Sequence, residues 1–171
     1  MRRGNRATAL AGVTAAMALA FSTPATAASC WSTTSVSAAQ VRELQAMMMA
    51  MALRCAAHGV PIHDSYNGFV RANMDALNAA SATLRVHFGE ANNGSGQDAY
   101  DRYTTELSNR YGSGHTSSSS CAAFSEIGAR AAASATNGGL ATFAAEIVPQ
   151  PHSIGTACPV TAGSQLAQAG R

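Results

Sequence analysis

The chain has 171 residues, of which 47% are hydrophobic and 12% are charged, so it can form one domain with a sizeable core but not several. A hydrophobic share this high excludes a wholly disordered chain. Eleven arginines and no lysine stand against nine acidic residues. Because the eight arginines after residue 28 are scattered singly, we do not expect the protein to bind the phosphates of a nucleic acid.

Residues 1–28 have the pattern of an export signal. Three arginines precede an uncharged apolar stretch, Ala7 to Phe21, and Ala25-Thr26-Ala27 then matches the small-x-small pattern of signal peptidase sites. These fifteen residues are fewer than the roughly 20 that cross a bilayer as a helix. We therefore predict cleavage after Ala27 or Ala28, no transmembrane span afterwards, and a periplasmic or secreted protein.

Export also decides how the cysteines are interpreted. Their number is even, and in an oxidising compartment they predict two disulfides: Cys30, Cys55, Cys121 and Cys158. None of them forms the CxxC pattern of a thiol redox enzyme or the CxxCH pattern of a haem attachment site.

Helical periodicity dominates the rest of the sequence. In the first expected helix, Ser32 or Ser37 is a candidate N-cap, and Gly59 followed by Pro61 marks the end. Its apolar residues recur at spacings of three and four, which places them on one face: Val41, Leu44, Met48, Met51 and Cys55.

Three further helices are expected. The second starts near Asp64 or Ser65 and runs to Phe88, and Gly68 inside it suggests close packing against a neighbouring element. The third covers residues 97–111 and the fourth residues 121–135, with one or two more turns at 140–147.

These elements divide the chain into a signal peptide (1–28), a helical domain (29–148) and a C-terminal segment (149–171). The last segment has too few large apolar side chains to order itself, so we expect a flexible, disordered tail.

The fold class is therefore all-α, a four-helix up-down bundle or a close variant. In such a bundle the first helix ends where the fourth begins, so we expect Cys55 to pair with Cys121. Cys30 then pairs with Cys158 at the opposite end. A Cys30–Cys121 pair is the alternative.

The run Met47-Met48-Met49-Ala50-Met51 is the most unusual local feature. Thioether sulfur suits Cu(I), so Met47 and Met51, one helical turn apart, are candidate copper ligands together with His58 and His63. Met48 and Met51 also lie on the apolar face of the helix, where methionine serves as an adaptable core side chain. Core packing is therefore the competing interpretation.

No catalytic or cofactor-binding residue is predicted. The sequence contains no HExxH, GxSxG or GxGxxG pattern, and its carboxylates are expected on helix surfaces and loop edges. An enzyme with a pocket between helices stays open as an alternative, and a buried Glu106 or Glu126 with a strongly raised pKa would favour it.

Several segments resemble an uncharacterised family of small exported, cysteine-containing helical proteins of bacteria. They are Cys30-Trp31, residues 41–45 (VRELQ) running to Leu53-Arg54-Cys55, Ser65-Tyr66-Asn67 and Phe69-Val70-Arg71-Ala72. Members are sometimes labelled S-adenosylhomocysteine hydrolase, but that enzyme is a much longer NAD-dependent protein, and no residue here matches its Rossmann fingerprint.

The sequence therefore favours a non-catalytic exported protein that acts by binding or as an envelope component, with an envelope protein as its partner. A carrier of copper or of a small ligand is the second hypothesis.

Overall fold

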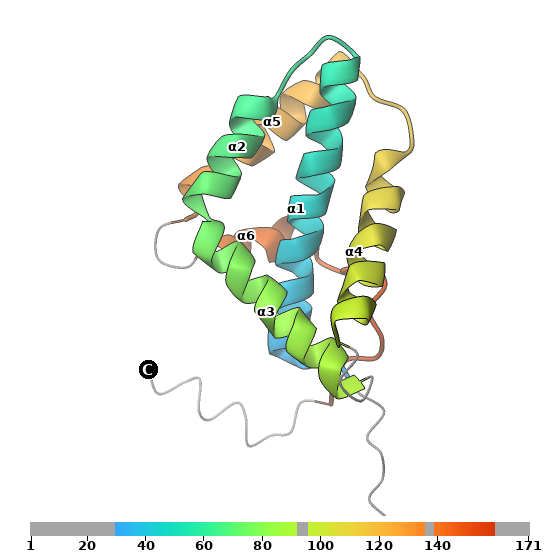
Figure 1. The fold of residues 1–171 in the computed structure, drawn as a ribbon. Coiled ribbons are helices and arrows are strands. Elements are labelled where there is room, and N and C mark those ends of the chain that lie inside the picture. The colour runs from blue at the N-terminus through green and yellow to red at the C-terminus, as the bar shows by residue number, and fades with distance from the viewer. Residues whose placement is uncertain (1–29, 92–95, 136–138, 160–171) are drawn as a thin grey trace, which may run out of the picture.

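A computed structural model describes residues 30–91, 96–135 and 139–159 of the chain. Within these residues the regular secondary structure consists of α-helices joined by loops, without a β-strand (Figure 1). These residues form six helices: α1 (Thr33–Ala57), α2 (His63–Ala72), α3 (Met74–Ala91), α4 (Gly96–Gly112), α5 (Ser118–Ala133) and α6 (Leu140–Ile147). None of these helices has the length and apolarity that a membrane span requires. The expected export signal lies outside the described residues.

Helix α1 is the centre of the fold and packs against each of the other five helices (Figure 1). Its N-cap is Ser32, whose Oγ accepts a hydrogen bond from the backbone N–H of Ser35 at 3.0 Å. Its end is marked by Gly59, which has a φ of +76°, a conformation that glycine adopts without steric cost. Because α1 has neighbours on nearly every side, its buried residues extend well beyond the one apolar face that the sequence predicts.

The second expected helix is divided in two. Asn73 separates α2 from α3 and is itself buried. Its side-chain amide donates hydrogen bonds to the carbonyl of Phe69 at 3.0 Å and to the carbonyl of Ala131 in α5 at 2.9 Å. An asparagine that bonds to nearby carbonyls offers the backbone an alternative to the continuous helix. The break lets α2 pack on α5 while α3 packs on α4.

Helices α2 and α5 therefore pair at one end of α1, α3 packs near its other end, and α4 runs beside α1 for much of its length (Figure 1). The close helix contact that we predicted at Gly68 occurs instead at Gly128 in α5. A Cβ atom there would lie 3.0 Å from Cε of Met48 and 3.1 Å from the backbone oxygen of Ser65, whereas nothing lies within 4 Å of the corresponding point at Gly68.

Two disulfides join distant parts of the chain. Cys55 is bonded to Cys121, and the pair is fully buried at the end of α1 among Met51, Ala52 and Ile62. Cys30 is bonded to Cys158 at the opposite end. These are the pairs that the predicted helix order favours, even though the second helix is broken.

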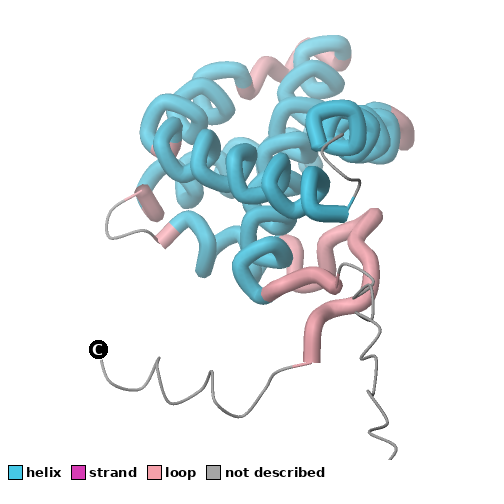
Figure 2. The backbone as a smooth tube through the Cα atoms, turned by 60° about the horizontal axis from the view of Figure 1, so that its bottom comes forward, coloured by secondary structure: helices cyan, strands magenta, loops and turns pink. Residues whose placement is uncertain are grey.

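The chain after α6 runs back along the molecule, as the pink tube that follows α6 in Figure 2. Trp31 donates its backbone N–H to the carbonyl of Thr156, and Cys158 donates to the carbonyl of Trp31, both at 2.9 Å. Residues 149–159 are thus fastened to the start of α1, although we expected them to belong to a flexible tail. The remaining part of that tail, residues 160–171, lies outside the described residues.

Candidate functional site

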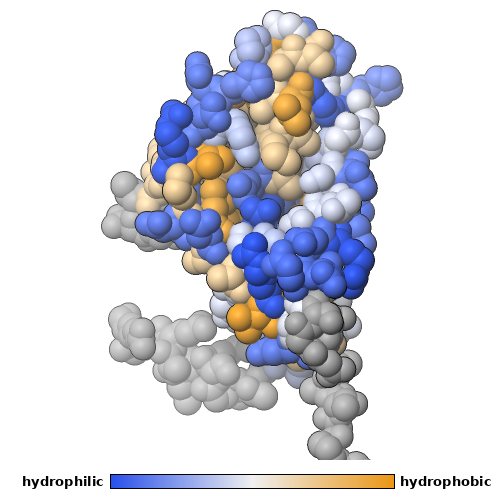
Figure 3. Space-filling model, viewed as in Figure 1, coloured by the Kyte–Doolittle hydropathy of each residue, from blue (hydrophilic) through white to orange (hydrophobic). Residues whose placement is uncertain are grey.

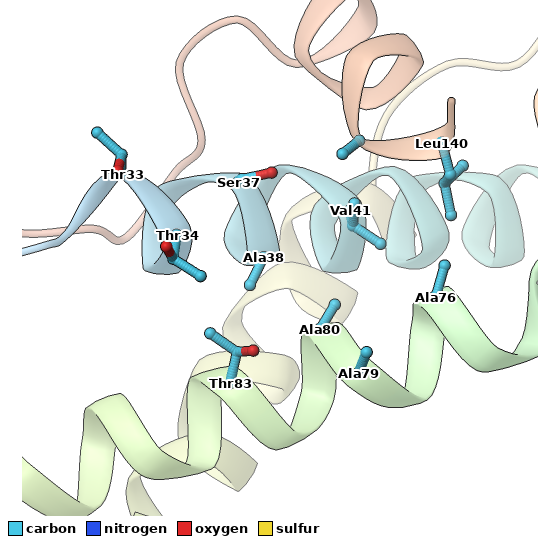
Figure 4. A pocket seen from close by; sticks show the side chains of 11 residues that line it. Thr33, Thr34, Ser37, Ala38, Val41, Ala76, Ala79, Ala80, Thr83 and Leu140 are labelled. Atoms are coloured by element: carbon cyan, nitrogen blue, oxygen red, sulfur yellow. The ribbon is translucent and has the colours of Figure 1, made fainter. Parts of the chain in front are cut away.

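A groove lies between α1 and α3, with α6 at one end (Figure 4). Its volume is about 450 Å³, and nearly all of the side chains that line it are small: Thr33, Thr34, Ser37, Ala38 and Val41 from α1, Ala76, Ala79, Ala80 and Thr83 from α3, and Leu140 and Ala141 from α6. Figure 4 shows side chains of the two helices that point toward one another across it, namely Thr34, Ala38 and Val41 of α1 and Ala76, Ala80 and Thr83 of α3. The groove contains no charged residue.

Two further depressions continue this groove. One, of about 460 Å³, shares Thr34 and Thr83 with it and extends to His87 and Glu90. The other, of about 250 Å³, shares Ala76 and Leu140 with it and extends to the α2–α3 junction. The groove therefore follows α3 along most of its length, with an uncharged middle and ionisable groups at both ends.

Two large apolar side chains stand exposed beside the groove. Val86 lines the depression near His87 and is 61% exposed, and Met74 lines the depression at the α2–α3 junction and is 52% exposed. The other exposed large apolar side chains of the described residues are Met49 and Leu53. On the face shown in Figure 3, apolar residues form separate patches between hydrophilic ones. Single exposed apolar residues are ordinary, so Val86 and Met74 matter because they adjoin a groove.

His87 lies at the polar end of the groove and is only 7% exposed. The centroid of its ring lies 4.0 Å from that of Trp31, and the two ring planes are tilted by 41°. Burial lowers the pKa of His87, and the charge of Glu90 opposes that shift. The imidazole is therefore mainly uncharged at neutral pH.

A second polar centre surrounds Glu43 on the opposite side of α1. This carboxylate is fully buried, a rare position for glutamate unless it is paired. Its Oε1 accepts hydrogen bonds from the hydroxyl of Tyr111 and from Nδ1 of His152. Its Oε2 accepts from the backbone N–H of His152 at 2.6 Å. Three donors thus satisfy the carboxylate and attach residues 149–159 to α1 and α4.

Two tyrosines near Glu43 have raised pKa values. Burial is the main reason that the pKa of Tyr111 is raised, and the hydrogen bond to Glu43 raises it further. Burial also raises the pKa of Tyr103, with a smaller contribution from the charge of Glu43. Both phenols therefore stay protonated and act as hydrogen-bond donors.

The candidate copper ligands lie in different surroundings. Met51 is buried beside the Cys55–Cys121 disulfide, and Met47 packs against the main core. His58 and His63 are exposed, at the end of α1 and the start of α2. Among the described residues no cluster of three His, Cys, Asp or Glu side chains could hold a metal ion.

The sequence analysis missed the most informative residues. Glu106 and Glu126, which we named as indicators of an enzyme, are both exposed, and the buried carboxylate is Glu43. A signal existed in the composition of α1, which has only three charged residues among 25: Arg42, Glu43 and Arg54. A long helix with so few charges is expected to be surrounded by others. His152 carried no comparable signal.

Comparisons of the chain with protein-family models, with curated protein sequences and with solved structures find no match. The functional interpretation therefore depends on the geometry described above.

Proposed function

We propose that this protein is an exported, non-catalytic binding protein of the cell envelope or its surroundings, and that it recognises a helical partner through the groove along α3. The observation that carries this proposal is the groove itself. On one side of the α1–α3 pair, α4 packs against both helices. On the other side, the only helix of the described residues that covers the groove is the eight-residue α6, which lies at one end.

The groove is better suited to a helix than to a small molecule. Sites for small ligands usually enclose most of the ligand surface, but this groove is open along its length. Small side chains on both walls allow a helix backbone to approach closely, and a helix needs to bury only one of its faces. The disulfides and the leader pattern support the assignment to an oxidising compartment outside the cytoplasm.

The residues around Glu43 support an enzymatic function less well than the groove supports a binding function. A carboxylate that orients a histidine is a common element of general-base catalysis, and the side chain of His152 is 43% exposed. Here, however, the same carboxylate also accepts from Tyr111 and from the backbone of His152. We therefore assign Glu43 a structural role, which is to hold residues 149–159 in place. No observation favours the copper hypothesis.

A photo-crosslinking amino acid placed in the groove tests the proposal. The full chain, with its leader, would be expressed in its own host with the crosslinker at Ala79, which is exposed and lines the groove. The matched control has it at Ala123, which is exposed on α5. We expect discrete protein adducts from Ala79 and none of the same mass from Ala123. Equal labelling at both positions would contradict the proposal.

Export is tested separately by mass spectrometry of the protein recovered from the periplasm or the medium. We expect a chain that begins at Ala28 or Ser29 and lacks four hydrogens, because both disulfides are formed. A full-length chain with free thiols would overturn the assignment to an oxidising compartment.

A further inference from the structure

Helix α3 carries a second stripe besides the one that faces the core. Five residues recur at spacings of three and four: Ala76, Ala79, Thr83, Val86 and Glu90. All five line the groove or its extension toward His87, and none is buried. This spacing is the pattern by which helices pair along their length. From Ala76 to Glu90 the stripe is about 21 Å long at the helical rise per residue.

We propose that a second copy of this chain occupies the groove, with the two α3 helices packed antiparallel about a twofold axis. This inference rests on the proposed function and names its partner. In an antiparallel pair the first position of each heptad faces the fourth position of the other helix. Ala76 then lies opposite Val86 of the second copy, and Ala79 lies opposite Thr83. Each larger side chain meets a smaller one, and symmetry repeats every contact.

Charge supports the antiparallel direction. The same register brings Glu90 to the α2–α3 junction of the second copy, where Arg71 is exposed and lines the depression. Neither Arg71 nor Glu90 belongs to an ion pair within the described residues. A parallel pair would instead place Glu90 against Glu90. Because Asp75 lies at the same end as Arg71, the ion pair sets the register more than the affinity.

His87 also lines this end of the groove, so a hydroxyl or carboxylate of the second copy can form a hydrogen bond with its imidazole. A lipid chain or a detergent offers no such bond.

Sedimentation equilibrium of the purified, oxidised protein over a wide concentration range tests the inference. We expect a reversible monomer–dimer equilibrium. Replacing Val86 by Arg should raise the dimer dissociation constant by about tenfold or more, with unchanged circular dichroism, because Val86 is exposed in the monomer. Ala123→Arg is the matched control on α5 and should leave the dissociation constant unchanged.

A charge exchange tests the register. Glu90→Arg should weaken the dimer, and Glu90→Arg combined with Arg71→Glu should restore it. A protein that stays monomeric at all concentrations, or a dimer that Val86→Arg does not weaken, would overturn the inference. In that case crosslinks from Ala79 to one identified protein, absent from Ala123, would still support the proposed function. If neither a dimer nor such crosslinks are found, the groove is not a binding site.

Discussion

The two sides of the α1–α3 pair differ in the size of the side chains that they present. On the side covered by α4, large side chains fill the space, among them Phe88 and Leu84 of α3 and Tyr100, Tyr103 and Leu107 of α4. On the groove side the same two helices present mainly alanine and threonine. Aromatic side chains dominate the burial of apolar surface, so the covered side stabilises the fold. The groove side contributes little to stability and is free to serve recognition.

The largest expected loss of stability comes from truncating a large side chain on the side that α4 covers. Tyr103 is buried, and its ring lies 5.5 Å from that of Phe88 and 6.4 Å from that of Trp31. Tyr103→Ala should lower the free energy of unfolding by about 3–5 kcal/mol. Thr83→Ala, its counterpart in the groove, should change it by less than about 0.5 kcal/mol. Urea denaturation followed by circular dichroism measures both, and similar losses would refute the comparison.

The next largest effect should come from Glu43, which lies on the covered side. Glu43→Gln removes the charge that accepts three hydrogen bonds and should cost about 2 kcal/mol. Tyr111→Phe should cost less. Because both changes break the same bond, the double variant should lose less than the sum of the two. Additive losses would show that Tyr111 and Glu43 do not act together.

Adding volume to small residues sharpens the comparison. Gly128 lies in a covered contact, where a methyl group would press on the backbone of Ser65, so Gly128→Ala should cost about 1–3 kcal/mol. Ala79→Leu adds more volume in the groove but should change the stability of the monomer by less than about 0.5 kcal/mol. Gly68→Ala has space around it and should stabilise the protein by up to about 1 kcal/mol.

The smallest effect concerns pH and His87. Burial lowers the pKa of His87 from its ordinary value of 6.5, so the unfolded chain binds more protons between the lowered value and 6.5. The free energy of unfolding should therefore fall as the pH is lowered through this window. His87→Gln should remove that part of the dependence. The measurement is the difference between the two stability curves from pH 7.5 to 4.5, and parallel curves would contradict it.

Local signals predicted much of this fold. The Ser32 cap and the end of α1 at Gly59 both depend on residues close in sequence, whereas α5 begins at Ser118, three residues before the expected start at residue 121. The break at Asn73 was not predictable in this way, because its amide bonds to Ala131, which is 58 residues away. The choice of Gly128 rather than Gly68 as the close contact also depends on which helices meet.

At the candidate site, too, local sequence signals predicted some residues, and others depend on how the helices pack. The spacing of Leu77 and Leu84 marks the buried stripe of α3, but the stripe through Ala76, Ala79 and Thr83 consists of residues that are common on any helix surface. The stripe can be recognised as the wall of a groove only in the folded structure, where α1 lies beside it and no helix among the described residues covers most of it. Glu43 could be recognised as buried only from the composition of the whole of α1. Its partner His152 could not be recognised at all.

The two disulfides are nested, since the bond between Cys55 and Cys121 lies inside the loop closed by Cys30 and Cys158. On the proposed export route the amino end leaves the cytoplasm first, so Cys30 and Cys55 reach the oxidising space before their partners, which follow 128 and 66 residues later. Until then the two thiols can form a wrong disulfide with each other, which must be exchanged afterwards. We expect maturation in a host that lacks a disulfide isomerase to accumulate the premature Cys30–Cys55 bond.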